Sequence, residues 1–182
     1  MKPGTVVWVT GPPSAGKSLF ARRLKARLEE LGAPCALLDG DEVRDALVPR
    51  PGYGPRARSA FYGTLAGLAA LLARQGLQVL VAATANRRAY RERARAIAPS
   101  FVEVFADVPP EVCARRDPKG LYRLARRGGA PNLPGAGAPY ERPEAPEVTA
   151  RGGLDERALR AVLARLTPGA SRAPRPRAPR RI

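Results

Sequence analysis

The sequence contains no histidine, and it has few cysteines and lysines. Without histidine, any general base in a catalytic site must be a carboxylate or a rarer group. The two cysteines, Cys35 and Cys113, lie inside apolar runs without metal-ligand spacing, so we expect buried thiols in a reducing compartment. There is no apolar run of about eighteen residues and no charged-then-apolar signal peptide, so we expect a cytoplasmic protein without a membrane span.

Arginine, by contrast, is abundant, and the formal net charge is +16. A charge of this size can indicate nucleic-acid binding. However, Ala, Gly, Pro and Arg are all common, and the lysines are only Lys2, Lys17, Lys25 and Lys119, which is typical of codon bias in a GC-rich genome. We therefore interpret most arginines as solvated surface residues and do not expect nucleic acid as a partner. A lysine inside a motif then indicates a specific chemical task.

Apolar periodicity predicts alternating strands and helices over most of the chain. Strands are predicted at 5–10, 35–39, 77–83 and 101–107, with a short edge strand closed by Thr149. Helices are predicted at 17–31, 41–47, 58–75, 87–98, 110–116, 120–127 and 154–166. This alternation predicts an α/β fold, with a parallel sheet covered by helices on both faces.

The 182 residues suffice for one α/β domain, which we place at 1–167. Within it, the apolar periodicity fades at about 117–146, where Gly, Pro and Arg dominate, and we interpret this segment as a mobile lid. Residues 168–182 are rich in Pro and Arg, cannot bury a core, and are predicted to be a disordered tail.

A glycine-rich motif lies between the first strand and the first long helix. Residues 11–18 spell G-P-P-S-A-G-K-S and fit the pattern G-x-x-x-x-G-K-[ST]. Backbone N–H groups of such a loop and the N-terminus of the next helix bind phosphates; Lys17 is expected to contact the β- and γ-phosphates, and the Ser18 hydroxyl to ligate Mg²⁺. The motif therefore predicts ATP and Mg²⁺ as cofactors and phosphoryl transfer as the reaction. The expected nucleotide-binding residues are Gly11, Pro12, Pro13, Ser14, Ala15, Gly16, Lys17, Ser18 and Leu19.

A second polar cluster follows the strand predicted at 35–39. Asp39 ends this strand at the carboxyl edge of the sheet, where ligands bind in such folds. A carboxylate there can accept a hydroxyl proton or hold a Mg²⁺-bound water, and Arg44 can bind a phosphate or sulfate with a bidentate fork. Asp41 also suits the N-cap of the next helix, and it can serve both purposes. We expect Asp39 and Arg44 to be functional.

Longer strings make the chain resemble the adenylylsulfate (APS) kinases over about residues 4–166. They are L-D-G-D-x-V-R at 38–44, F-V-E-V-F-A-D at 101–107, R-D-P-K-G-L-Y at 116–122 and P-Y-E-x-P-E-x-P-E at 139–147. The last two are far more specific than the phosphate loop, which many unrelated enzymes share. The resemblance implies a three-layer P-loop kinase fold with a five-stranded parallel sheet in the order 2-3-1-4-5. It also implies a homodimer, which the sequence itself does not show.

The resemblance implies phosphate transfer from ATP to the 3′-hydroxyl of adenylylsulfate, giving 3′-phosphoadenylylsulfate in sulfate assimilation. Asp39 is then the catalytic base beside Lys17, and Arg44 and Arg58 bind the phosphosulfate of the acceptor. A cation at Lys119 neutralises charge as the lid closes. The implied substrate-binding residues are Asp39, Asp41, Arg44, Tyr53, Arg58, Lys119 and Leu133, with Tyr53 stacked on the acceptor adenine.

Several positions depart from the family's pattern. Phe61 replaces an asparagine that helps to hold the acceptor, and Leu133 replaces the lid phenylalanine of the adenine clamp. Thr84-Ala85-Asn86 replaces an Ile-Ser-Pro turn, so no serine is available for phosphorylation there. The altered positions are Ala57, Phe61, Gly63, Thr64, Ala85 and Leu133.

These departures affect the identity of the acceptor substrate more than they affect the type of reaction. Three hypotheses follow from the sequence. The first is an adenylylsulfate kinase, and the second is a related P-loop kinase that acts on another small hydroxyl or nucleotide. The third is a non-catalytic binder whose basic tail holds nucleic acid or a partner.

Overall fold

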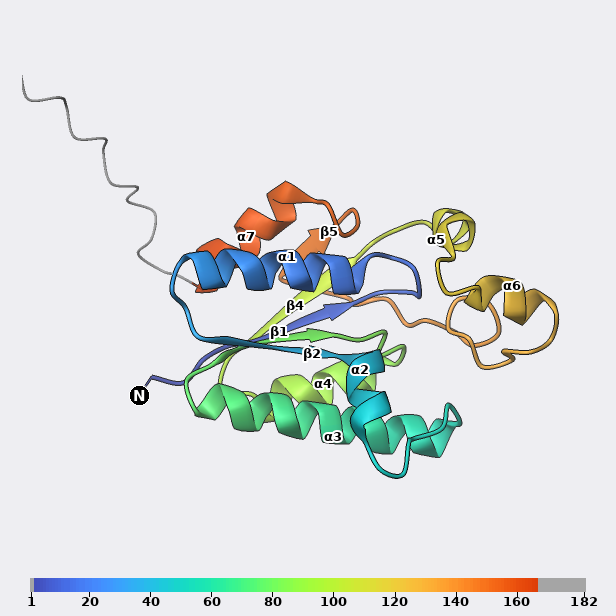
Figure 1. The fold of residues 1–182 in the computed structure, drawn as a ribbon, viewed down its shortest axis with the longest axis horizontal. Coiled ribbons are helices and arrows are strands. Elements are labelled where there is room, and N and C mark those ends of the chain that lie inside the picture. Colours follow the sequence, from blue (N-terminus) through green and yellow to red (C-terminus); the bar gives the residue numbers. More distant parts are fainter. Residues whose placement is uncertain (1, 167–182) are drawn as a thin grey trace, which may run out of the picture.

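The computed structural model describes residues 2–166, so the tail predicted at 168–182 lies outside the described part. Strands and helices alternate along it, as the apolar periodicity predicts (Figure 1). The strands are β1 (Val6–Thr10), β2 (Cys35–Asp39), β3 (Gln78–Ala82), β4 (Phe101–Ala106) and β5 (Val148–Ala150). The helices are α1 (Lys17–Glu30), α2 (Gly40–Ala46), α3 (Pro55–Arg74), α4 (Arg88–Ile97), α5 (Pro110–Arg116), α6 (Leu121–Arg126) and α7 (Glu156–Leu166).

The five strands form one parallel sheet in the order β2-β3-β1-β4-β5. The central strand β1 pairs with β3 on one side and β4 on the other, so that Trp8 lies opposite Val81 and Glu103. The predicted sheet and its strand order are confirmed. Because all strands run in the same direction, the loops at their carboxyl ends meet at one edge of the sheet.

Helices cover both faces of the sheet, because alternate side chains of β1 point to opposite sides. Val7 and Val9 face a core built with α1 and α7, whereas Val6 and Trp8 face a second core built with α3 and α4. Figure 1 shows these two helix layers, with α5 and α6 beyond the carboxyl ends of the strands. No helix of the described residues is long and apolar enough to span a membrane.

Two helix starts differ by more than one residue from the sequence prediction, and both differences have a local cause. α3 begins at Pro55 instead of residue 58, since proline suits the first turn of a helix. α7 begins at Glu156 instead of residue 154, because the Asp155 carboxylate accepts the N–H of Ala158 at 2.9 Å and caps the helix.

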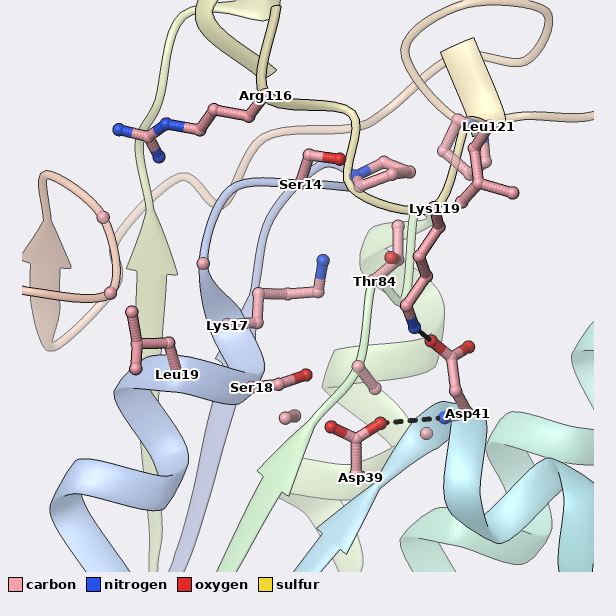
Figure 2. A pocket seen from close by; sticks show the side chains of 18 of the residues that line it. Ser14, Lys17, Ser18, Leu19, Asp39, Asp41, Thr84, Arg116, Lys119 and Leu121 are labelled. Carbon is pink, nitrogen blue, oxygen red and sulfur yellow. Dashed lines mark hydrogen bonds and ion pairs between the residues drawn. The ribbon is translucent and has the colours of Figure 1, made fainter. Parts of the chain in front are cut away.

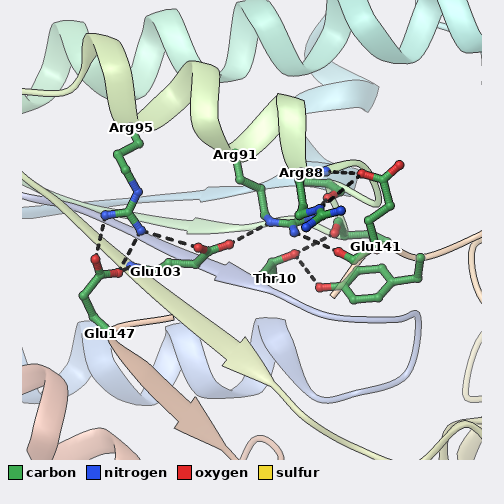
Figure 3. Close-up of polar contacts among 10 residues, drawn as sticks. Thr10, Arg88, Arg91, Arg95, Glu103, Glu141 and Glu147 are labelled. Carbon is green, nitrogen blue, oxygen red and sulfur yellow. Dashed lines mark hydrogen bonds and ion pairs between the residues drawn. The ribbon is translucent and has the colours of Figure 1, made fainter. Parts of the chain in front are cut away.

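A network of charged side chains holds the end of the predicted lid segment against the domain (Figure 3). Arg91 of α4 donates to Glu103 of β4 at 2.7 Å, and both side chains are almost fully buried. Arg91 also donates to the Glu141 carbonyl at 2.8 Å, and Arg95 of α4 pairs with Glu147 at 2.6 Å. Removing one partner of such a buried pair costs about 3–5 kcal/mol. The string at 139–147 therefore has a structural task, which is to fix the chain that leads into β5.

Candidate active site

A cavity of about 1510 Å³ lies at the carboxyl ends of the strands. Its walls come from the phosphate loop, from β2 and α2, from α3, from the lid segment and from the chain after β5. Three of the predicted nucleotide-binding residues, Gly11, Pro12 and Ala15, do not line it and are buried within the loop. The predicted site residues that line it are Pro13, Ser14, Gly16, Lys17, Ser18, Leu19, Asp39, Asp41, Arg44, Tyr53, Arg58, Lys119 and Leu133.

The phosphate loop folds through backbone conformations that favour glycine. Gly11, Ser14 and Gly16 all have a positive φ, and α1 begins immediately afterwards at Lys17. A Cβ at Gly16 would lie 2.6 Å from the backbone nitrogen of Gly153, so no other residue fits there without movement. The loop and the helix N-terminus thus present the backbone arrangement that binds phosphate in other proteins.

Lys17, the first residue of α1, is half-buried and lines the cavity. Its Nζ donates to the Pro12 carbonyl at 2.8 Å. Burial lowers the pKa of Lys17 to about 8, although the negative charges of Asp41 and Asp39 partly oppose this shift. An anionic phosphate beside the ammonium group would favour its charged form. Figure 2 shows the Lys17 and Ser18 side chains directed into the cavity.

Asp39 has two structural positions at once, as the last residue of β2 and the N-cap of α2. Its Oδ1 accepts the backbone N–H of Asp41 at 3.0 Å. The alternative that Asp41 is the N-cap is therefore wrong, because α2 begins at Gly40 directly after the strand. Asp39 is buried at the cavity wall, and its carboxylate faces the same space as the Ser18 hydroxyl (Figure 2). Within residues 2–166, the Ser18 hydroxyl makes no hydrogen bond.

Arg44 of α2 is 3% exposed and is held by a turn and two aromatic rings. Its Nη1 donates to the carbonyls of Pro51 at 3.0 Å and Gly52 at 2.9 Å. Its guanidinium carbon lies 3.8 Å from the ring centroid of Phe61 and 4.6 Å from that of Tyr53. Burial lowers the pKa of Arg44, but a guanidinium stays charged at neutral pH.

Arg58 of α3 approaches the same cavity from the lid side. Its Nη2 donates to the Asn132 carbonyl at 2.6 Å, and its Nη1 donates to Asn86 Oδ1 at 3.4 Å. Neither Arg44 nor Arg58 forms an ion pair with a carboxylate of the described chain. Two buried cations that form no ion pair are a chemical arrangement that can accommodate an anion in this part of the cavity.

The start of the lid segment contacts both sides of the cavity. Lys119 forms an ion pair with Asp41 of α2, and this contact raises the pKa of Lys119 (Figure 2). Both side chains are exposed, so the pair contributes about 0–1 kcal/mol. Tyr122 of α6 donates to the Pro13 carbonyl of the phosphate loop at 3.1 Å. The segment therefore contacts both α2 and the phosphate loop.

Comparison with known proteins shows which family this chain belongs to. A family model described as adenylylsulphate kinase matches residues 3–151. The probable adenylyl-sulfate kinase of Archaeoglobus fulgidus is 43% identical over 143 residues, which cover 79% of this chain and 92% of that protein. The adenylyl-sulfate kinase of Burkholderia ambifaria is 45% identical over 148 residues, which cover 80% and 82%.

A solved structure agrees. The Mycobacterium tuberculosis APS kinase CysC, in complex with AMPPNP and APS, matches with a TM-score of 0.84 at 35% identity. The match covers 92% of this chain and 100% of that one. The chain belongs to the adenylyl-sulfate kinase family. The resemblance and the P-loop kinase fold predicted from the sequence are thus confirmed, and the chain is a kinase.

Most departures from the adenylyl-sulfate kinase pattern lie outside the cavity. Ala57, Gly63, Thr64 and Ala85 do not line it, whereas Phe61 and Leu133 do. Leu133 is buried in a small apolar cluster of the lid and the phosphate loop, which includes Ala15 and Tyr122. Phe61 is 3% exposed, packs against the sheet, and contacts Arg44. Phe61 and Leu133, together with Thr84 of the changed Ile-Ser-Pro turn, which also lines the cavity, are thus the departures that can affect an acceptor directly.

The sequence did not identify the wall of the cavity that follows β5. Arg151, Gly152, Gly153, Leu154 and Asp155 line the cavity. The available signal was the glycine pair after the edge strand, since its backbone packs against Gly16 of the phosphate loop. Arg116 also lines the cavity, and its position at the start of the R-D-P-K-G-L-Y string could have indicated this.

Proposed function

We propose that this kinase transfers the γ-phosphate of ATP to the 3′-hydroxyl of adenylylsulfate, producing 3′-phosphoadenylylsulfate and ADP. One observation carries the proposal: Arg44 and Arg58, two buried cations without a carboxylate partner in residues 2–166, line the same cavity as Lys17 and Asp39. Such a cavity suits an anionic acceptor beside a phosphate donor. Membership of the adenylyl-sulfate kinase family supports adenylylsulfate as that acceptor.

The donor phosphates would bind to the phosphate loop, the N-terminus of α1 and the Lys17 ammonium group. The residues at hand suit Mg²⁺. The Ser18 hydroxyl, which has no hydrogen bond within the described chain, would be one ligand. Among the described residues, no cluster of three or more His, Cys, Asp or Glu side chains could hold a metal by itself. Mg²⁺ commonly takes its remaining ligands from phosphates and water, and when bound it neutralises charge on the phosphates.

Asp39 would act on the acceptor hydroxyl. The oxygen of the 3′-hydroxyl forms a bond to the γ-phosphorus, its proton passes to the Asp39 carboxylate, and the bond from the γ-phosphorus to ADP breaks. Asp39 is anchored for this task because one carboxylate oxygen caps α2. Lys17 would stabilise the charge on the transferred group throughout.

The acceptor's phosphosulfate would bind to Arg44 and Arg58, and its adenine would lie between Tyr53 and Leu133. Tyr53 is half exposed, so its ring can receive a base without rearrangement of the core. Lys119 and Asp41 would contact the acceptor at the mouth of the cavity, where their ion pair can exchange for contacts with a bound anion.

The proposal also includes the organisation of the chain. Residues 1–167 form one kinase domain, 117–146 act as its lid, and the enzyme works in the cytoplasm, where ATP is available. The Lys119 contact to α2 and the Tyr122 contact to the phosphate loop support a lid that responds to ligands. A homodimer stays a prediction, which light scattering of the purified chain tests.

The decisive experiment measures ADP release and the phosphorylated product with adenylylsulfate, AMP and other small hydroxyl acceptors. We expect turnover with adenylylsulfate, and formation of 3′-phosphoadenylylsulfate seen by ion-exchange chromatography. AMP is the matched control, because it lacks the sulfate that the two arginines would bind. Turnover with another acceptor alone would favour a related kinase of altered specificity, and no turnover at all would favour a binder.

A further inference from the structure

The Arg44 guanidinium lies against the ring of Phe61, with 3.8 Å between the guanidinium carbon and the ring centroid. Both residues are 3% exposed, so this contact is shielded from water. An arginine over an aromatic face is attracted by the ring's electrons, and the attraction increases when water is excluded. Phe61 also packs edge-on against Tyr62, with 5.3 Å between ring centroids.

Arg44 uses only part of its guanidinium group for hydrogen bonds within the described chain. Nη1 is occupied by the carbonyls of Pro51 and Gly52, whereas Nε and Nη2 make no hydrogen bond within residues 2–166. A carboxylate beside Arg44 would orient the guanidinium but would also neutralise it and compete with an acceptor anion. An aromatic face orients the same group and leaves its charge available.

We propose that Phe61 is a positioning residue for the acceptor, which acts through Arg44 by holding the guanidinium in the orientation that binds an anion. The inference rests on the proposed function. It gives a role to the position at which the family has an asparagine: here the ring supports the anion-binding arginine from behind. Selection of the acceptor's anionic group therefore depends on a residue that has no polar atom in its side chain.

Phe61→Leu tests this role, because leucine stays apolar but has no aromatic face. We expect the KM for adenylylsulfate to rise about threefold to tenfold, while kcat and the KM for ATP stay near wild type. Phe61→Tyr keeps the ring and should restore the acceptor KM. The matched control is Phe101→Leu, since Phe101 also carries a guanidinium, that of Arg95 at 4.7 Å, but lies outside the cavity. This control should leave the acceptor KM unchanged.

A double-mutant cycle separates positioning from general damage to the core. Arg44→Lys keeps the charge but loses the planar fork, so Phe61→Leu should add little to the acceptor KM in that background. Melting curves confirm that each variant is folded. If Phe61→Leu does not fold, Phe61→Met replaces it, because methionine fills irregular space without an aromatic face.

Two results would overturn the inference: an unchanged acceptor KM in a folded Phe61→Leu protein, or additive effects in the cycle. Failure of the proposed function has a different signature, since the wild-type chain would then not turn over adenylylsulfate. The same cycle is then run with the acceptor that the wild type does use. Coupling between Phe61 and Arg44 there would support the positioning role, and additive effects would reject it.

Discussion

The donor side and the acceptor side of the cavity are built in different ways. The proposed donor side comes from one continuous stretch, the loop before α1, in which the backbone conformation and a single lysine would provide the binding groups. The acceptor side is assembled from α2, the turn at Pro51 and Gly52, α3 and the lid. A site made by the backbone leaves little room for substitution. A site assembled from side chains on separate segments can replace one neutral residue and keep its charge, and the contact of Arg44 with Phe61 is consistent with this.

Loss of the donor-side lysine should have the largest effect. We expect Lys17→Ala to reduce kcat by about a thousandfold or more, because the ammonium group stabilises charge on the transferred phosphoryl group. The melting temperature should show an intact fold, since the change removes a cation whose pKa is already lowered by desolvation. Lys25→Ala on the exposed face of the same helix is the control. Wild-type rates in Lys17→Ala would rule out phosphoryl transfer at this loop.

Asp39 joins the two sides, and its loss should have the next largest effect. Asp39→Asn removes the proton acceptor but keeps a side chain that can still cap α2. We expect kcat to fall by about a hundredfold to ten-thousandfold, with little change in the KM for ATP. Asp45→Asn, on an exposed position of the same helix, should behave like wild type. A loss of ATP affinity at unchanged kcat would instead make Asp39 a metal ligand or a structural residue.

The acceptor side should show a smaller and more selective effect. Arg58→Ala should raise the acceptor KM by about tenfold or more, the cost of losing a charge-assisted hydrogen bond of roughly 1.5–3 kcal/mol. The KM for ATP should hardly change, because Arg58 contacts the lid and Asn86 and not the phosphate loop. Arg74→Ala, at the exposed end of α3, is the control. Equal increases in both KM values would contradict separate donor and acceptor sides.

The same difference decides what the sequence could predict. The phosphate loop, the strand that ends at Asp39 and the order of the sheet are confirmed, because local periodicity, a contiguous motif and a family resemblance specify them. The N-cap of α2 was assigned to the wrong aspartate, because Asp39 and Asp41 both fit the local pattern and only the packed helix start decides between them.

Other features depend on contacts between distant segments, which no local pattern contains. The wall at Gly152 and Gly153 lies against the phosphate loop because β5, which precedes it, pairs with β4. From the sequence, Phe61 could be interpreted only as a replacement of the family's asparagine. Its contact with Arg44 could not be predicted, since it requires α2 and α3 to pack together. The part that sequence reasoning missed is therefore mainly how the acceptor arginines are supported.

The smallest expected effect concerns pH, and it separates the two sides most directly. The pKa of Lys17 is lowered to about 8 by burial, so its charge is present below this pH and is lost as the pH rises through it. The KM for ATP at about pH 8.5 should then be about fourfold higher than at about pH 7, because only the charged lysine attracts the phosphates. On the acceptor side, the cations are guanidinium groups, which as a class do not titrate over this range, so the acceptor KM should stay constant.

Steady-state kinetics from about pH 7 to 9 measure both KM values. Calorimetric titration with AMPPNP in two buffers of different ionisation enthalpy adds an independent readout, since binding above pH 8 should take up a proton on Lys17. Lys17→Arg is the control, because a guanidinium does not titrate here and its ATP affinity, however weak, should not vary with pH. A KM for ATP that does not vary with pH, without proton uptake in the wild type, would show that Lys17 keeps its charge. The contrast between a titrating donor side and a non-titrating acceptor side would then be wrong.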